Sequence, residues 1–338
     1  MNLETLAVSA ARSGNLSDLA NQLRVSEREL RGLLMRRGLS SELPALREEL
    51  APHLPVNDDL LLDQDAAALL DEAETLARKH PVRHQQHYQH QFPGDAPYLI
   101  TFTGDWHIGE AGTDHVRLKE DAQLISELRE GRHVLVAMGD YIGGYMASRT
   151  PSNNAQVLSP DKQRVAARGL LDLLSPDLIL EGDHDCWHNR HDNELEWIQD
   201  YCRLTGTRYA QWGASLEITA GRMKTRVLAR HRFDGSRAVN PYLPQVNLNL
   251  KHGPADIVAL AHVHSNPGVS QQASKRETDG RFWAVQSGTY KTFDDYGKKL
   301  GVGNGEYGVP SLLVLPEEGL ILPYPDLEEA VKTAKALQ

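Results

Sequence analysis

Cysteine and long apolar stretches are scarce in this sequence, and their scarcity narrows the classes of protein that it can encode. Only two cysteines occur among the 338 residues, which excludes a small disulfide-stapled protein and suits a reducing compartment. The sequence has no run of about 18 apolar residues, so no transmembrane helix is expected. The amino terminus lacks a basic start followed by an apolar block, which argues against a secretory signal. We therefore expect a cytoplasmic protein that has no membrane partner.

The overall composition is that of a globular protein. Hydrophobic residues make up 40% of the chain and charged residues 24%, which excludes a disordered chain and a collagen-like fibre. A length of 338 residues suits about two domains and is enough to bury a core without cross-links. The formal net charge of −10 excludes a uniformly basic nucleic-acid binder, so any nucleic-acid contact must come from a local patch.

Hydrophobic patterning divides the chain into consecutive segments. Residues 1–55 have a helical pattern and carry no net charge. Residues 56–96 are acidic; they begin with an Ala- and Leu-rich stretch that predicts a helix and end in a polar stretch that predicts a linker. Residues 97–325 alternate short apolar runs with helical segments, which predicts an α/β sandwich. Residues 326–338 predict a short C-terminal helix.

The segment LSDLANQLRVSERELRGLL at residues 16–34 has the spacing of two helices joined by a turn. Ser26 and Glu29 form a capping-box pattern at the start of the second helix. The segment resembles helix–turn–helix DNA-binding families, except that Arg24 stands where the turn glycine is usual. The side chains that would contact DNA are Arg28, Arg31 and Arg36. Because the segment carries no net charge, an equal alternative is a helical docking module or a homodimer contact.

Five polar blocks follow apolar runs in the α/β segment. They contain Asp105 and His107, Asp140, Asp183 with His184 and Asp185, His231, and His262 with His264. Ligand-binding residues of α/β folds collect at the carboxyl ends of strands, so these blocks are expected to lie close together. Residues two apart in an extended strand point the same way, which predicts that Asp105 and His107 reach one site. Each block alone is more often a turn, a cap or a rim histidine, so the prediction rests on the five together.

The side chains of these blocks suit two divalent metal ions, because they include three carboxylates and four imidazoles. Three aspartates contribute −3 and two such ions contribute +4, so the site would carry +1 and attract an anionic phosphate ester. Mixed Asp and His ligation suits Mn²⁺, Fe²⁺ or Zn²⁺, and we favour Mn²⁺. The sequence therefore predicts a two-metal centre whose substrate is a phosphoester.

The order of the blocks resembles that of the calcineurin-like metallophosphoesterase superfamily. The family pattern is Asp-x-His, Gly-Asp, Gly-Asn-His-Asp/Glu, a single His, and Gly-His-x-His. The blocks here are GDWHIG, MGDYIGG, EGDHDCW, ARH and LAHVHS. The resemblance covers residues 97–325 and implies a four-layer α/β/β/α sandwich in which helices flank two sheets. The small all-α N-terminal domain precedes it.

The resemblance also implies a role for each residue of the blocks. The first metal ion would bind Asp105, His107 and His264, and Asp140 would bridge both ions. The second ion would bind Asp183, His231 and His262. His184 would stand beside the substrate as the acid that assists the leaving group, and Asp185 would orient His184.

Three positions depart from the family pattern without removing a ligand. Asp183 replaces the family's Asn, which should strengthen cation binding and weaken the Lewis acidity of the second ion. Gly143 replaces a second Asp, which predicts a looser contact behind the ligands. Ala261 replaces the Gly that precedes the last motif, which is a mild change.

Two neighbouring features are interpreted from pattern alone. His252 is an alternative ligand to His231, which we prefer because it ends an apolar run. Tyr290 and Lys291 lie in the segment 287–299 and could reach a phosphate or stack on a base. The favoured interpretation of that segment is a surface turn with solvated charges.

The resemblance is compatible with three functions. The favoured one is a metal-dependent phosphodiesterase or nuclease acting on DNA, because GDWHIG is similar to the opening motif of double-strand-break-repair nucleases and a helix–turn–helix pattern precedes it. This fusion is also similar to metallophosphoesterases of phages. The first alternative is a small-molecule phosphodiesterase or phosphatase acting on nucleotides, and the second is a DNA-binding regulator with a structural metal site. The acidic segment 56–96 counts against extended DNA contact.

Overall fold

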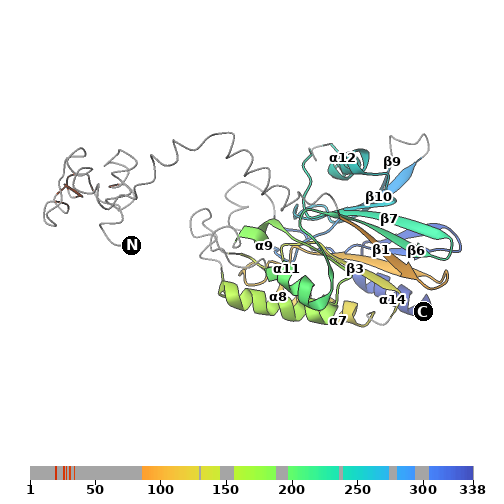
Figure 1. Cartoon of the computed structure of the whole chain (residues 1–338), viewed down its shortest axis with the longest axis horizontal. Helices are drawn as coiled ribbons and strands as arrows, with labels where there is room; N and C mark the ends of the chain where they lie inside the picture. The colour runs from red at the N-terminus through yellow and green to blue at the C-terminus, as the bar shows by residue number, and fades with distance from the viewer. Residues whose placement is uncertain are drawn as a thin grey trace, which may run out of the picture. The chain divides into compact units, whose positions relative to one another are not determined.

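The structure is a computed structural model, shown for the whole chain in Figure 1. It describes residues 86–128, 131–144, 156–187, 197–235, 239–273, 280–293 and 304–337, together with Ala20, Ser26, Arg28, Leu30, Arg31 and Leu34. None of the helices in these ranges is both long and apolar enough to cross a membrane. The chain divides into two compact units, Met1–Val82 and Arg83–Gln338. The sheets and the candidate site belong to the second unit.

One sheet of the second unit, called sheet I, is built on four parallel strands. The strands β2 (Tyr98–Thr103), β3 (His133–Ala137), β4 (Leu178–Leu180) and β5 (Arg208–Ala210) are neighbours in that order. Two antiparallel strands, β11 (Ser311–Leu315) and β12 (Leu320–Tyr324), complete the edge next to β2. Every residue of β2 is buried, as expected of a strand that is covered on both faces.

The other sheet, called sheet II, has the order β1-β6-β7-β8-β10-β9. Its strands are β1 (Gln86–Phe92), β6 (Ala214–Ala220), β7 (Met223–Arg230), β8 (Ile257–Leu260), β9 (Gly268–Ala273) and β10 (Arg281–Gln286). The strands β7, β8 and β10 run parallel, whereas β6 and β7 form an antiparallel pair. The carboxyl ends of β7 and β8 therefore lie at the same edge of sheet II.

The strand β1 replaces part of the linker that the sequence predicts within residues 56–96. It pairs with β6 in parallel along its full length. Alternate side chains of β1 turn inward, and Tyr88 and Phe92 pack in the core between the sheets. The linker prediction was wrong for this strand because Gln86 and His90 fill the other inward positions. The sequence of β1 therefore lacks the apolar alternation that marks a half-buried strand.

Three clusters of buried side chains show how the layers stack. Residues of both sheets, such as Phe102 of β2 and Val227 of β7, form the core between sheet I and sheet II. The outer face of sheet I packs on α7 (His115–Ser126), α8 (Pro160–Leu174), α11 (Trp197–Thr205) and α14 (Leu327–Leu337). The outer face of sheet II packs on α12 (Leu243–His252). The prediction of an α/β sandwich is confirmed, with layers in the order helices, sheet, sheet, helix (Figure 1).

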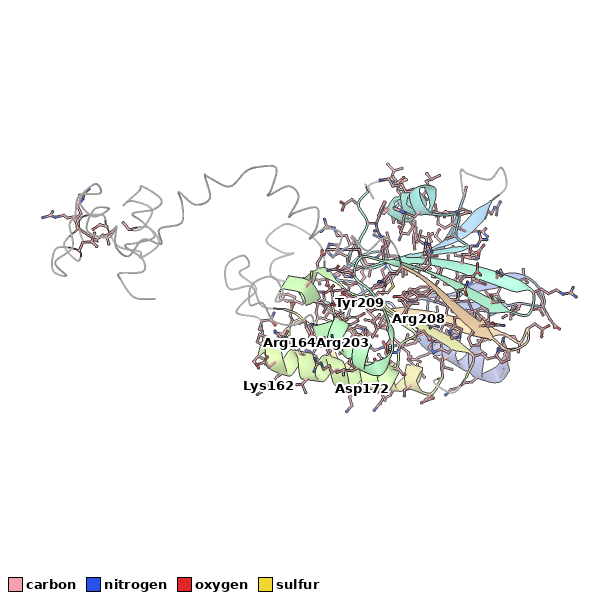
Figure 2. All side chains as sticks on the ribbon, viewed as in Figure 1. Lys162, Arg164, Asp172, Arg203, Arg208 and Tyr209 are labelled. Atoms are coloured by element: carbon pink, nitrogen blue, oxygen red, sulfur yellow. The ribbon has the colours of Figure 1, made fainter. Side chains whose placement is uncertain are left out.

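Polar contacts also join the elements that cover the β4 and β5 end of sheet I. Asp172 of α8 accepts a hydrogen bond from the Tyr201 hydroxyl of α11 at 2.9 Å. Tyr209 of β5, which Figure 2 labels beside Arg208, donates to Glu181 at 2.7 Å. Glu181 directly follows β4, so this contact holds the loop that carries the third polar block.

The described residues of the first unit bear on the helix–turn–helix prediction. Ala20, Leu30 and Leu34 are helical and buried. The Leu30 amide donates to the Ser26 carbonyl oxygen at 3.0 Å, which suits a helix that begins near Ser26. These contacts concern one helix only, so the helix–turn–helix arrangement stays a prediction.

The three arginines predicted to contact DNA fall partly within the described residues. Arg28 is exposed and Arg31 is half-buried, and both are helical. Arg36 lies outside the described residues, as does the helix predicted within 56–96. Contact with DNA also stays a prediction.

Candidate metal centre

The five polar blocks lie at the carboxyl ends of strands, as the sequence predicts. Asp105, Asp140 and Asp183 follow β2, β3 and β4 of sheet I. His231 and His262 follow β7 and β8 of sheet II. Parallel strands bring their carboxyl ends to one edge of a sheet, and the two sheets share one core. The blocks of both sheets therefore meet at one place.

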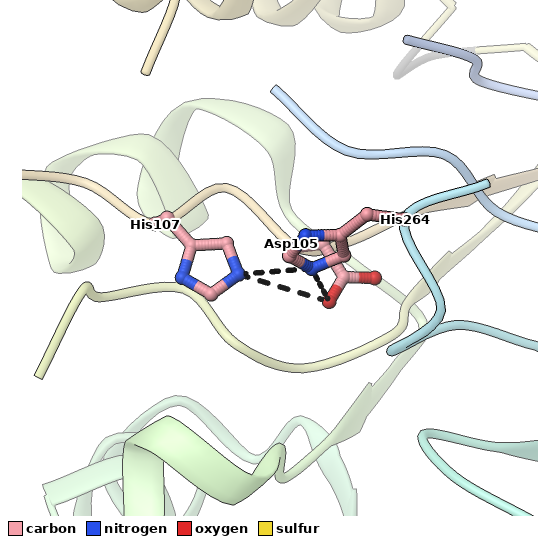
Figure 3. Close-up of side chains that lie close together, drawn as sticks. All are labelled: Asp105, His107 and His264. Carbon is pink, nitrogen blue, oxygen red and sulfur yellow. Dashed lines mark hydrogen bonds and ion pairs between the residues drawn. The ribbon is translucent and has the colours of Figure 1, made fainter. Parts of the chain in front are cut away.

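Asp105, His107 and His264 form the first cluster, in which three ligand atoms face one another (Figure 3). The Nε2 atom of His264 lies 3.2 Å from Asp105 Oδ1 and 3.2 Å from His107 Nε2. The His107 Nε2 atom lies 3.9 Å from the same carboxylate oxygen. All three atoms lie within 4.8 Å of one another, so one metal ion can bind them together.

Asp140, His231 and His262 form the second cluster. His231 Nε2 lies 3.3 Å from Asp140 Oδ2, and the ring centroids of His231 and His262 are 5.2 Å apart. Asp140 Oδ2 also lies 4.0 Å from His107 Nε2, so this carboxylate stands between the two clusters. The alternative ligand His252 ends α12 and belongs to neither cluster.

Asp183 begins the short helix α9 (Asp183–Trp187) at the edge of the second cluster. Its Oδ2 atom lies 3.6 Å from His262 Nδ1 and 3.3 Å from Arg232 Nη1. The Arg232 guanidinium offsets the negative charge that Asp183 brings in place of the family's asparagine. The structure therefore gathers six of the seven predicted ligands into two clusters and places the seventh, Asp183, beside the second.

The ring of His231 is oriented for a cation. Its Nδ1 atom lies 2.8 Å from the Met138 carbonyl oxygen, which can only accept, so Nδ1 carries the proton. In the neutral ring Nε2 then turns a lone pair toward Asp140, and Nε2 is buried without a hydrogen-bond partner among the described residues. Burial lowers the pKa of His231, but the Asp140 carboxylate outweighs burial and raises the pKa to about 10. This pair of side chains needs a cation between them, either a proton or a metal ion.

Two buried charged residues orient His107 from the side opposite the first cluster. Its Nδ1 atom lies 3.3 Å from Glu110 Oε1, and Glu110 Oε2 lies 2.6 Å from Lys291 Nζ. Burial lowers the pKa of His107 to about 4, so its ring is neutral. Burial raises the pKa of Glu110, but His107 and Lys291 outweigh burial and lower it to about 2. His107 Nδ1 and Glu110 Oε1 do not form a hydrogen bond, but the charge of Glu110 favours the tautomer with the proton on Nδ1, in which the Nε2 lone pair of His107 faces the first cluster.

Glu110 was not predicted as a residue of the site, and Lys291 was named only as a residue that could reach a phosphate or stack on a base. The interpretation of residues 287–299 as a surface turn was wrong for Tyr290 and Lys291, which are buried, whereas residues 294–299 lie outside the described residues. Glu110 fills the space beside Gly143, where a Cβ would collide with the Glu110 side chain. The glycine that departs from the family pattern therefore makes room for a carboxylate from another loop. No pattern within one segment signals this exchange.

Four residues of the site adopt a left-handed backbone conformation. The φ angles are 48° for Asp105, 45° for His107, 53° for Asp140 and 65° for His262. Residues that carry a Cβ rarely adopt this conformation, and such strain gathers at functional sites. Asp105 and His107 reach one cluster as predicted, but the reason given for it was wrong. The strand β2 ends at Thr103, and both side chains are aimed by a turn rather than by extended backbone.

His184 and Asp185 lie on α9 beside Asp140. The His184 amide donates to Asp140 Oδ1 at 2.8 Å, and the ring Nδ1 lies 2.5 Å from the Gly143 carbonyl oxygen. The buried Asp185 carboxylate accepts hydrogen bonds from the amides of Asp140, Tyr141 and Gly182. Asp185 therefore ties the loops after β3 and β4 together. The Gly143 carbonyl makes the contact to the His184 ring that the sequence analysis expects of Asp185.

A cavity of about 340 Å³ opens beside the second cluster. His231 and Asp183 line it, whereas no residue of the first cluster does. Small-ligand sites have volumes of about 300–1,000 Å³, so this cavity lies in their range. The second cluster is therefore the one that a bound molecule can approach from the cavity.

Comparison with known proteins finds no matching family description and no matching curated protein. A protein of unknown function from Aquifex aeolicus is similar in structure at 13% identity, over 50% of this chain and 81% of that one, with a TM-score of 0.30. A 5′-nucleotidase from Candida albicans is similar at 13% identity, over 75% of this chain and 56% of that one, with a TM-score of 0.31. A hypothetical protein from Thermus thermophilus is similar at 13% identity, over 67% and 98%, with a TM-score of 0.34. Similarity at this level carries no argument about function, which is therefore inferred from the site.

Proposed function

We propose that this chain hydrolyses phosphoesters with two bound divalent metal ions, and that the favoured substrate is a phosphodiester of DNA. The observation that carries the proposal is the pair of clusters with Asp140 between them. Carboxylate oxygens and imidazole lone pairs converge there, and such groups repel one another unless cations lie between them. Pairs of metal ions held by Asp and His side chains are well suited to phosphoester hydrolysis.

The residues of the chain would divide ion binding between the two sheets. Asp105, His107 and His264 would hold one ion, and Asp140, His231 and His262 would hold the other. When bound, two such ions lower the pKa of a water molecule and neutralise charge on the phosphate oxygens. The Lys291–Glu110 pair would keep His107 in the tautomer that binds an ion.

His184 would move a proton to the leaving group. Its ring lies 4.6 Å from the His107 ring, centroid to centroid, beside the first cluster. Because Nδ1 donates to the Gly143 carbonyl oxygen, a protonated His184 carries its second proton on Nε2. Histidine can give up such a proton near neutral pH, which a leaving alkoxide requires.

Two substrate classes are supported by different observations. The exposed, helical Arg28 supports DNA, because arginines on such a helix commonly contact backbone phosphates. The cavity of about 340 Å³ supports the second candidate, a nucleotide-sized diester or monoester.

Hydrolysis by the full chain with Mn²⁺, with and without a chelator, tests the proposal. The substrates are bis(p-nitrophenyl) phosphate, p-nitrophenyl phosphate, and labelled single- and double-stranded DNA. Asp140→Asn and His184→Ala are expected to lose activity, and His87→Ala, at an exposed position of β1, is the matched control. Metal-dependent DNA cleavage supports the DNA enzyme, and ester turnover with intact DNA supports the nucleotide enzyme. Two bound ions with no hydrolysis of any substrate would overturn both and favour a regulator with a structural metal site.

A further inference from the structure

The cavity beside the second cluster contains groups that ion binding does not need. Besides Asp183 and His231, the side chains that matter here are Trp212, Arg230, Phe233 and Lys251. They come from the turn between β5 and β6, from the end of β7 and the loop after it, and from α12. Three separate parts of the chain therefore contribute to one wall.

Arg230 is a half-buried cation that has no anionic partner among the described residues. Its Nε atom is buried without a hydrogen-bond partner there. The side chain passes over Gly213, where a Cβ would collide with it. Its guanidinium carbon lies 5.8 Å from the centroid of the Phe233 ring. A partly buried charge without a partner is costly, so the cavity is expected to receive an anion from a ligand.

Lys251 brings a second cation to the same aromatic ring. Its Nζ atom lies 5.3 Å from the centroid of Phe233, on which Arg230 also lies. Lys251 stands at the end of α12, whereas Arg230 ends β7. Two cations from different elements thus approach the same ring at the wall of the cavity.

The acidic residues of the cavity are paired with other groups. Glu181 accepts a hydrogen bond from the Tyr209 hydroxyl at 2.7 Å. Asp234 lies 3.3 Å from Arg232, which also pairs with Asp183. The cavity wall thus carries three carboxylates and three cations, and among the described residues none of these carboxylates forms an ion pair with Arg230 or Lys251.

Trp212 offers an aromatic face at the same cavity. Its side chain is 52% exposed, which is unusual for a residue of this size. The neighbouring Gln211 also lines the cavity and carries an amide that can bond to a base edge. Exposed aromatic rings beside cationic side chains are the means by which proteins bind unpaired bases and their phosphates.

We propose that this cavity binds one nucleoside phosphate of the substrate, next to the phosphate that is hydrolysed. The base stacks on Trp212, and Arg230 and Lys251 bind a phosphate that is not cleaved. The inference rests on the proposed function, because it places the cleaved phosphate at Asp183 and His231, where the cavity meets the second cluster. A free dinucleotide and the end of a DNA strand offer this same chemistry.

The proposed role of the cavity is tested by comparing kcat/KM between substrates, using the full chain with Mn²⁺. The substrates are bis(p-nitrophenyl) phosphate, the dithymidine diester without a terminal phosphate, and the same diester with a 5′-phosphate. Arg230→Gln should lower the kcat/KM ratio of the phosphorylated over the unphosphorylated dinucleotide about tenfold, and Arg230→Lys should restore part of it. Trp212→Ala should lower the ratio of either dinucleotide over the aryl diester about tenfold.

A matched control and a longer substrate complete this experiment. Arg226→Gln changes an exposed arginine on the same strand, β7, and should leave both ratios within about twofold. A 5′-phosphorylated DNA 12-mer separates the two sources of the ligand. Preference for the 12-mer assigns the cavity to a DNA end, and preference for the dinucleotide assigns it to a free nucleotide.

Binding of thymidine 3′,5′-bisphosphate, measured by quenching of tryptophan fluorescence, separates this inference from the proposed hydrolase activity. Quenching that is lost in Trp212→Ala and weakened about tenfold in Arg230→Gln supports the cavity even if no ester is hydrolysed. Hydrolysis of the aryl diester, without quenching and with unchanged ratios in both variants, would overturn the cavity proposal and leave the hydrolase proposal standing. Circular dichroism of each variant confirms that it is folded.

Discussion

The two clusters use the same types of side chain but differ in their surroundings. The first cluster rests on Glu110 and Lys291, which are buried and aligned behind His107. The second borders a cavity of about 340 Å³, and the side chain of the adjoining Asp183 is 27% exposed. Under the proposed function, the first would hold an ion in place and the second would let an ion meet a ligand. The two sets of ligands are similar, so the proposed difference in their roles comes from the neighbouring groups.

The electrostatics of the clusters differ in the same direction. Burial lowers the pKa of His107 to about 4, so this ligand is neutral before an ion arrives. For His231, burial also lowers the pKa, but Asp140 outweighs burial and raises it to about 10. A metal ion entering the second cluster must therefore displace a proton, whereas one entering the first need not.

Removing the carboxylate between the clusters should have the largest effect. Asp140→Asn takes a negative charge from both ion sites, and we expect kcat/KM for bis(p-nitrophenyl) phosphate to fall about a thousandfold or more. Bound Mn²⁺, counted by mass spectrometry, should fall with it. Asp161→Asn, at a side chain that is 90% exposed, is the control. Full activity in Asp140→Asn would show that neither ion site needs this carboxylate.

Changing the support of the first cluster should weaken one ion only. Glu110→Gln removes the charge that orients His107, and losing such a partner typically lowers metal affinity about 10- to 100-fold. Titration with Mn²⁺ against a competing chelator should show one weakened ion and one unchanged. Because the variant leaves the buried Lys291 without this carboxylate, the double variant Glu110→Gln/Lys291→Met serves as a check on folding. Equal weakening of both ions would contradict the separation of the clusters.

The opposite pKa shifts predict a stability maximum in the metal-free protein. His231 has a raised pKa of about 10, so its stabilisation is complete below its ordinary value of 6.5 and is lost as pH rises toward 10. His107 has a lowered pKa of about 4, so its contribution is present above 6.5 and is lost as pH falls toward 4. Urea unfolding between pH 4 and pH 10 should therefore give a maximum near pH 6.5 from these two groups.

Adding Mn²⁺ and replacing His231 should each reduce the decline on the alkaline side of that stability profile. Mn²⁺ replaces the proton on His231, so the decline above pH 6.5 should shrink when the metal is present. His231→Gln should remove the decline on that side in the metal-free protein and leave the acid side intact. An unchanged decline in the variant would assign it to another group.

The smallest effect is expected at Asp183. Asp183→Asn introduces the family's residue and removes one charge beside the second cluster, but Arg232 already offsets that charge. We expect Mn²⁺ to bind the second cluster only about two- to fivefold more weakly, the scale of one partly exposed ion pair. The variant Asp183→Asn/Arg232→Gln removes both charges and should bind Mn²⁺ much as the original does. A loss as large as that in Asp140→Asn would make Asp183 a principal ligand.

The polar residues at the strand ends could be predicted because each short segment contains two sequence signals. An apolar run followed by Asp or His, as at Asp105, Asp140 and His262, marks both a buried strand and a polar group at its end. The order of five such blocks was enough to predict which residues meet. The α/β sandwich followed from the same alternation of runs and helical segments.

The remaining features depend on contacts between distant segments. The pairing of Glu110 with Lys291 joins two loops, and neither loop has a pattern that signals a buried charge. The left-handed backbone conformation of Asp105 and His107 was not predicted, because the sequence pattern indicated extended backbone for both residues. The strand β1 is held by pairing with β6 although its inward positions include polar residues. Sequence patterns report local burial, and these features arise only when the sheets come together.

The number and coupling of bound Mn²⁺ ions test the central claim most directly. Mn²⁺ would be added to the metal-free full chain, counted by mass spectrometry, and examined by electron paramagnetic resonance. We expect two ions per chain with a spin-coupled signal, because Asp140 lies between the clusters, and we expect the coupling to be lost in Asp140→Asn. A single ion, or two ions without magnetic coupling, would contradict a shared two-metal centre.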